Sequence, residues 1–175
     1  MQSDRIRWDD CPPKDRPLYI PILSPRVGAP IVVTLLGGGL VGVHTHHLQR
    51  RTFPCVGAVE PCEGCHQGQA SRWKGYLAAW SRQSSRLVIA ELTLQAFADN
   101  YHLLTVKRPN LRGWSLRLER SGRRCNSPVR ATFEQPPINL KEVPLAFDVK
   151  AQLLHIWNRT RAVPEADVPD LGPIG

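Results

Sequence analysis

Cysteine and histidine, two side chains that bind transition metals, gather in one short stretch of this chain. Residues 44–76 read HTHHLQRRTFPCVGAVEPCEGCHQGQASRWKGY and contain three of the five cysteines and four of the six histidines. Cys62 and Cys65 are separated by two residues, a spacing at which two thiolates bind one tetrahedral zinc ion from a tight turn. Cys55, further upstream, is the natural third ligand. This stretch therefore predicts a zinc site.

The fourth zinc ligand is expected from a histidine on the segment that precedes the cysteines. His46 is the predicted ligand, with His44 and His47 as alternatives, because alternate side chains of a strand share a face and only one parity would point at the cysteines. His66 directly follows Cys65 and is poorly placed to complete the same tetrahedron. Four protein ligands close the site, so the predicted zinc is structural and holds a loop with few apolar residues.

Other interpretations of the cysteines are a redox pair or free buried thiols. A redox CxxC usually begins a helix in a βαβ unit, whereas Cys62 lies in a glycine-rich loop. In a reducing compartment an odd, crowded set of cysteines favours metal binding over disulfides. Gly57 and Gly64 are expected to relieve backbone strain around the ligands. Cys11 and Cys125 stand apart from the cluster, and the sequence assigns them no role.

Positive charge is concentrated in the middle of the chain. Residues 50–130 hold fourteen basic and five acidic side chains, a net charge of +9, whereas the whole 175-residue chain carries +8. Eighteen of the 23 basic residues are arginine, whose planar guanidinium binds phosphate and stacks on bases. The alternative is a solvated basic face on an arginine-rich protein. The segregation of charge favours a polyanionic partner.

Two groups of cations and aromatics are the candidates for contacting a single-stranded nucleic acid. Cations follow the phosphates, and aromatic rings stack on bases for about 1–3 kcal/mol each. In the alternative interpretation the tryptophans belong to the core and the arginines lie on the outer face. The first group is Arg72, Trp73, Lys74 and Tyr76, and the second is Arg112, Trp114, Arg117, Arg120, Arg123 and Arg124.

The elements that must position these residues are mainly strands. Three glycines, Gly37 to Gly39, either separate two strands as a turn or form a bulge in one long strand. Helical spacing predicts two amphipathic helices, at 92–104, capped by Thr93, and at 145–159. Residues 48–71 are expected to form the cysteine loop. Apolar or alternating patterns predict strands at 18–23, 30–36, 72–80, 86–92, 113–120 and 128–134.

Five main strands with a helix between the third and the fourth are the layout of the OB-fold, a small barrel that binds single strands. We therefore predict a mainly β fold with two helices, an OB-fold-like five-stranded barrel over residues 30–160 with an inserted zinc loop. Prolines predict an extended N-terminal arm over residues 1–29. The acidic, proline-rich residues 161–175 predict a disordered C-terminal tail.

The order His, Cys55, Cys62-x2-Cys65 in a basic, OB-like domain resembles the single-stranded DNA-binding proteins of T-even phages. The motif match covers residues 44–65, and RGWSLRLERSGRRCNSPVRATF is similar to a hairpin of phage-type zinc-bearing OB proteins. The resemblance implies zinc in an OB-fold core and an acidic tail. It implies zinc ligands at His46, Cys55, Cys62 and Cys65, and a DNA groove lined by Trp73, Lys74, Tyr76 and the arginines of 112–130.

These patterns predict a non-catalytic protein that binds single-stranded nucleic acid, with DNA expected ahead of RNA, in phage or mobile-element replication or recombination. The acidic tail is expected to recruit replication or recombination proteins, or to shield the groove as a mimic of DNA charge. No run approaches the roughly 20 apolar residues that cross a bilayer. The polar N-terminus is not a secretory signal, so a cytoplasmic protein without membrane contact is expected.

Two alternative functions remain open from the sequence. One is a zinc-stabilised interaction module in a larger nucleoprotein assembly, whose basic face meets RNA or an acidic protein. The other is a rolling-circle nuclease, because His44-Thr45-His46 resembles the paired-histidine metal motif of those enzymes and Tyr101 could be the nucleophile. The nuclease hypothesis leaves the three clustered cysteines unexplained.

Overall fold

The computed structural model describes most of the predicted central domain. The predicted N-terminal arm up to residue 19, nearly all of the predicted tail, Cys11 and Cys125 lie outside the described residues. The described residues are 20–37, 39–48, 51–57, 62–106, 111–124, 127–136 and 138–161.

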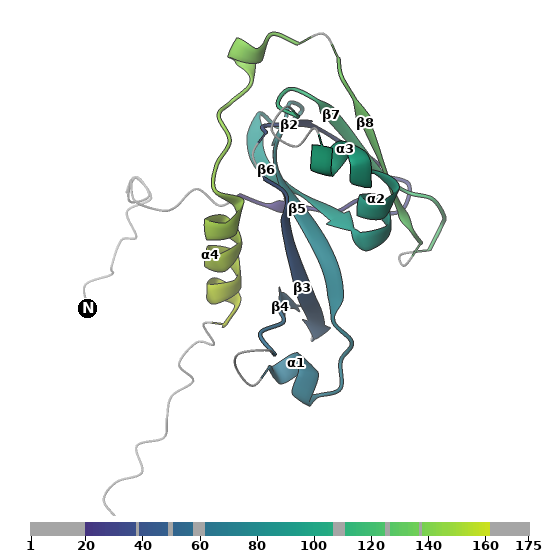
Figure 1. The fold of residues 1–175 in the computed structure, drawn as a ribbon, viewed down its shortest axis with the longest axis vertical. Coiled ribbons are helices and arrows are strands. Elements are labelled where there is room, and N and C mark those ends of the chain that lie inside the picture. The colour runs from purple at the N-terminus through teal and green to yellow at the C-terminus, as the bar shows by residue number, and fades with distance from the viewer. Residues whose placement is uncertain are drawn as a thin grey trace, which may run out of the picture.

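The described fold is mainly β, and its strands belong to one mixed sheet (Figure 1). The main path through the sheet runs β1-β6-β5-β2-β7-β8, and β3 and β4 branch from β5. β1 pairs with β6 in parallel, and the other pairs are antiparallel. The strands are β1 (Ile22–Leu23), β2 (Ile31–Leu35), β3 (Val41–Leu48), β4 (Arg51–Pro54), β5 (Arg72–Ser81), β6 (Arg86–Thr93), β7 (Ser115–Arg120) and β8 (Val129–Glu134).

The helices are short, and none of those described is long and apolar enough to cross a membrane. The predicted helix at 92–104 is divided at Asn100, whose side-chain amide donates to the carbonyls of Ala96 at 3.0 Å and Ala131 at 3.1 Å. Thr93 caps the first half as predicted, because its hydroxyl accepts from the Ala96 N–H at 3.2 Å. The helices are α1 (Glu63–His66), α2 (Leu94–Asp99), α3 (Tyr101–Val106), α4 (Val149–Arg161) and the 3-10 turn η2 (Leu140–Glu142).

β5 organises the sheet, because strands pair with both of its edges. One edge pairs with β6, and the other pairs first with β3 and then with β2, so β3 and β2 lie end to end along it. Leu35 lies opposite Ala79 and Val41 opposite Tyr76, which places three extra residues between β2 and β3. Gly37, with φ of 82°, begins this bulge. The glycines therefore interrupt one long strand, the second of the two predicted arrangements.

Both faces of the β5–β6 hairpin are buried, which alternation of side chains allows. One face contributes residues such as Leu77 and Val88 to a core shared with α2, α3 and the β7–β8 hairpin. The other face is covered by α4. There the buried residues of the sheet and of α4 are Tyr76, Ala78, Ile89, Val149, Leu153 and Trp157.

The predicted OB-fold-like five-stranded barrel is corrected to an open sheet of eight described strands with four described α-helices. β8 lies close to β6 and α2, but its ladder partner is β7. The Ala131 carbonyl of β8 accepts from Asn100 at the end of α2. A helix end thus contacts β8. The coarser prediction of a mainly β fold is confirmed.

Candidate metal centre and nucleic-acid surface

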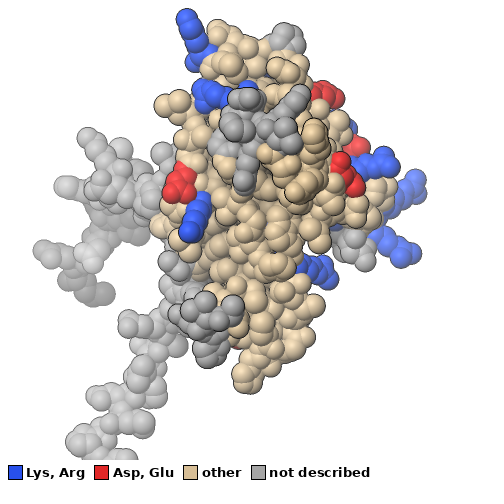
Figure 2. All heavy atoms as spheres, in the orientation of Figure 1, with Lys and Arg blue, Asp and Glu red and all other residues tan. Residues whose placement is uncertain are grey.

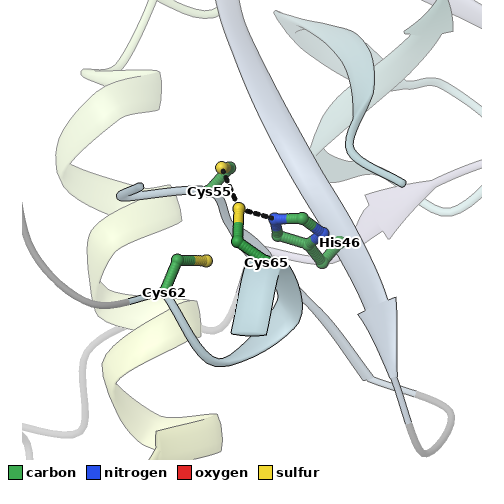
Figure 3. Close-up of side chains that lie close together, drawn as sticks. All are labelled: His46, Cys55, Cys62 and Cys65. Carbon is green, nitrogen blue, oxygen red and sulfur yellow. Dashed lines mark hydrogen bonds between the residues drawn. The ribbon is translucent and has the colours of Figure 1, made fainter. Parts of the chain in front are cut away.

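The four predicted ligands meet in the lobe that β3, β4 and α1 form (Figures 1 and 3). One ligand atom from each of His46, Cys55, Cys62 and Cys65 lies within 4.8 Å of all the others. Cys65 Sγ lies 3.6 Å from Cys55 Sγ and 3.4 Å from His46 Nε2. A tetrahedral zinc ion with ordinary bond lengths gives edges of about 3.8 Å between sulfurs and about 3.5 Å from sulfur to nitrogen. The donors and their spacing therefore fit one zinc ion.

β3 decides which histidine joins the cluster. His44 and His46 share a face of the strand, but His46 is only 1% exposed whereas His44 lies in solvent. His47 points to the other face and contacts Thr52, with 3.2 Å between Nδ1 and Oγ1. Nδ1 of His46 is buried and has no hydrogen-bond partner in the described structure, so Nε2, which faces a sulfur, is the ligand atom. Of the three candidates, the structure places His46 in the cluster.

Two pieces of backbone position the cysteines. Cys55 follows β4, and its N–H donates to the His44 carbonyl at 2.7 Å, which extends the β3–β4 ladder by one bond. Cys62 is the N-cap residue of α1 and Cys65 lies within the helix, and the His66 N–H donates to the Cys62 carbonyl at 2.9 Å. The hairpin thus supplies two ligands and the single helical turn supplies the other two.

Gly57 and Gly64 make room for the ligands, a different reason from the predicted relief of backbone strain. Neither is among the glycines with positive φ. A Cβ on Gly64 would lie 2.3 Å from Cγ of His46, and a Cβ on Gly57 would lie 3.1 Å from Cys65 Sγ. A side chain at position 64 would therefore push the His46 ring out of its place.

The thiols of Cys62 and Cys65 differ in acidity. The backbone N–H of Cys65 is the main cause that lowers the pKa of Cys62 to about 6, against the opposing effect of burial. A hydrogen bond with Cys55 is the main cause that raises the pKa of Cys65 to about 11. Neighbouring thiolates repel one another, so a divalent cation is what allows three of them to act as deprotonated ligands together.

This metal cluster is the clearest chemical feature of the described chain. No protein-family model, curated protein or solved structure matches the sequence or the fold. A functional assignment must therefore be argued from the residues of this chain.

Lys74 and Tyr76, two of the predicted nucleic-acid contacts, are engaged within the fold. Tyr76 is 0% exposed, lies edge-on to Trp157 with ring centroids 6.1 Å apart, and has a pKa raised by burial. Lys74 Nζ lies 2.8 Å from Glu91 Oε2 in a half-buried ion pair. Because α4 covers this face of β5, we remove Lys74 and Tyr76 from the predicted groove.

Arg112 and Arg120 are also engaged within the fold, because their guanidinium groups donate to backbone carbonyls. Arg112 donates to the Pro144 carbonyl at 2.7 Å and to three further carbonyls at 2.5–3.5 Å. Arg120 donates to the Pro25 carbonyl at 2.8 Å and to the Ser127 carbonyl at 2.9 Å. Both arginines therefore join separate segments of the fold.

The exposed remainder of the predicted surface is mostly arginine. Arg72 begins β5, and Arg123 and Arg124 lie between β7 and β8, all exposed. Arg117 is exposed and forms a 3.0 Å ion pair with Glu119, an interaction of little net strength at a surface. Figure 2 shows several Lys and Arg side chains projecting on the right, where Figure 1 places β8 and its turn. Trp73 and Trp114 are half-buried and pack against the core.

The structure also brings together aromatic residues that the sequence had not assigned to a nucleic-acid surface. Phe97 contacts Trp73, and Tyr101, which is 59% exposed, contacts Phe97. Their sequence signal was helical spacing, which predicted a stripe facing the core. Of the His44-Thr45-His46 motif, His46 belongs to the cysteine cluster and His44 lies in solvent.

Proposed function

We propose that this protein is a non-catalytic, metal-stabilised protein that binds single-stranded nucleic acid. The observation that carries the proposal is the cluster of one histidine and three cysteines, whose last ligand, Cys65, lies seven residues before the start of β5, the strand that begins with Arg72 and Trp73. Four protein ligands leave a tetrahedral metal no open position for a substrate. A zinc ion here would stabilise the lobe, and the cations and aromatic rings beside it would bind the ligand.

The positive charge supports a polyanionic ligand. Residues 50–130 carry a net charge of +9 from fourteen basic and five acidic residues, and most of the basic residues are arginine. Exposed arginines bind phosphates bidentately and stack on bases. With the engaged side chains removed, the proposed phosphate contacts are Arg72, Arg117, Arg123 and Arg124.

The order of the elements supports a relationship to OB-fold proteins. The interrupted strand β2–β3 is followed by β5 and β6, then by two helices, then by β7 and β8. In an OB-fold the second and third strands present the oligonucleotide face. Here α4 covers one face of the corresponding β5–β6 pair through Leu153 and Trp157. A nucleic acid would therefore use a different surface, beside α2 and along the β7–β8 turn.

The biological setting belongs to the same proposal. The order of one histidine followed by three cysteines is similar to that of the T-even phage proteins, which supports DNA ahead of RNA and a role in replication or recombination in the cytoplasm. Recruitment of other replication or recombination proteins would fall to the acidic residues after 161.

Equilibrium binding to a fluorescein-labelled oligo(dT) tests the proposal. The metal-loaded protein should prefer the single strand to a duplex of equal length and bind more weakly at about 200 mM than at about 50 mM salt, because binding releases cations. Replacing Arg123 and Arg124 together with alanine should lower the salt slope by about 0.7 for each phosphate that the variant no longer neutralises. Lys150→Ala, at an exposed position of α4, is the control.

No oligonucleotide binding at the lower salt concentration would overturn the proposed function. A protein that retained its metal but bound no oligonucleotide would favour the interaction-module alternative.

A further inference from the structure

We propose that Tyr101, Phe97 and Trp73 form a base-stacking subsite, a proposal that rests on the proposed single-strand binding. The three rings form a row from the sheet to the surface of α3. The ring centroids of Trp73 and Phe97 are 4.8 Å apart, and those of Phe97 and Tyr101 are 5.7 Å apart with the rings nearly perpendicular. These distances are those of aromatic pairs in contact.

The sheet fixes the inner end of this row. Gly42 of β3 and Gly75 of β5 lie opposite each other, and the Trp73 indole lies across both. A Cβ on Gly42 would lie 2.9 Å from the indole, and a Cβ on Gly75 would lie 2.8 Å from it. Two residues without side chains therefore form a flat floor for the ring. The Trp73 ring is held before any ligand arrives, which reduces the entropy lost on binding.

The outer end of the row is free to meet a ligand. Tyr101 is 59% exposed and Leu94, on the same helical stripe as Phe97, is 57% exposed, whereas Leu104 one turn after Tyr101 is 1% exposed. Burial of Leu104 satisfies the core side of α3. Tyr101 therefore contributes little to the core and offers one ring edge and face to solvent.

The net charge of the segment that carries the row favours a nucleic acid over an apolar partner. Residues 50–130, which include all three aromatic residues, carry a net charge of +9. Asp99, the acidic residue of α2, is hydrogen bonded to Gln95 at 2.6 Å, off the helical stripe that carries Phe97. In Figure 2 most of the lower lobe is free of charged side chains, and Asp or Glu side chains as well as Lys and Arg lie above it on the right. An uncharged aromatic row in a positively charged segment matches bases flanked by phosphates.

The test compares Tyr101→Ala and Tyr101→Phe in binding to oligo(dT) and to an abasic oligomer of the same length. Tyr101→Ala should weaken oligo(dT) binding roughly 5- to 100-fold, the effect of losing one stacked base, and should leave abasic binding nearly unchanged. Tyr101→Phe keeps the ring and should stay within about twofold of the wild type. Leu154→Ala, at an exposed position of α4, is the control.

The outcomes separate this inference from the function on which it rests. If the wild type binds oligo(dT) and Tyr101→Ala binds it equally well, the stacking subsite is refuted and single-strand binding stands. If Tyr101→Phe loses as much affinity as Tyr101→Ala, the hydroxyl matters instead of the ring, which also refutes stacking. If the wild type binds no oligonucleotide, both proposals fail. A second variant, Leu94→Ala, should reduce oligo(dT) binding by less than Tyr101→Ala.

Discussion

At the scale of single residues, the metal cluster depends on two glycines without side chains as much as on its four ligands. Gly64 allows α1 to lie directly on the His46 ring, and Gly57 lies over the sulfurs. The sequence spacing predicted the cysteines well, because ligand geometry constrains spacing in a turn. It could not predict the reason for the glycines, because that depends on which side chain packs against them.

Gly64→Ala should weaken zinc binding. The added methyl group would fall 2.3 Å from Cγ of His46, so the ring must leave its position. We expect zinc affinity to drop by about 10- to 100-fold, as when a group that orients a ligand is lost. Competition with a chromophoric chelator measures this, with Gln67→Ala on the same exposed turn as the control. Equal affinities of the Gly64 variant and the wild type would contradict the packing of α1 on His46.

Lys74 and Arg72 are two residues apart on β5, and replacing each with alanine should have opposite effects on stability and on oligonucleotide affinity. Lys74→Ala leaves Glu91, whose side chain is 12% exposed, without its partner, and should lower the free energy of unfolding by about 1–3 kcal/mol. It should leave oligonucleotide affinity unchanged. Arg72→Ala should lower affinity and leave stability nearly unchanged, since surface substitutions are usually within about 0.5 kcal/mol. Urea unfolding and oligo(dT) titrations of both variants decide between structure and binding at each position.

Sequence patterns could not separate these two roles. Alternation correctly places Lys74 and Tyr76 on one face of β5 and Trp73 on the other. It does not tell which face a distant helix covers. The covering helix, α4, comes more than seventy residues later in the chain, and only the tertiary fold brings it onto Tyr76.

At the scale of elements, the long patterned strands were predictable and the short elements were not. β5, β6, β7 and β8 agree closely with the predicted ranges because their apolar alternation is strong. β4 and α1 lie inside the region predicted as a loop. Each is only four residues long and lacks an apolar pattern. They are held by hairpin pairing and by the ligand cluster, which no local pattern records.

Asn100 lies between α2 and α3, which the sequence predicted to be one helix. Its side chain binds the carbonyls of Ala96 and of Ala131 in β8. Asn100→Ala should therefore destabilise the fold by about 1–2 kcal/mol, the cost of removing two hydrogen bonds. Gln95→Ala, also on α2, removes a surface bond to Asp99 and should cost less than about 0.5 kcal/mol. Thermal or urea unfolding compares them, and an Asn100 variant as stable as the Gln95 variant would contradict this link.

At the scale of the whole molecule, the lobe of β3, β4 and α1 and the rest of the sheet are stabilised by different interactions. The two apolar cores lie on the faces of the β5–β6 hairpin and include no residue of β4 or α1. The predicted barrel is instead an open sheet, and Asn100 at the end of α2 donates to the Ala131 carbonyl of β8, a long-range contact that element order does not reveal. The lobe instead has the metal cluster as its centre.

Metal removal should therefore unfold the lobe before the rest of the sheet. After chelation, backbone amides of β4 and α1 should exchange with deuterium much faster, because the bound metal supplies much of the folding free energy there. Amides of β6, in the middle of the sheet, should keep their protection. Hydrogen exchange with mass spectrometry measures both regions in one experiment. Equal loss of protection in β6 would show that the two parts unfold as one unit.

Zinc content of the purified protein tests the central claim most directly. Elemental analysis should find about one zinc ion per chain in the wild type and in His44→Ala, whose side chain lies in solvent beside the cluster. His46→Ala and Cys62→Ser should lose most of this zinc, because each removes one of four ligands. Zinc absent from the wild type, or retained equally by His46→Ala and His44→Ala, would contradict the metal centre on which the proposed function rests.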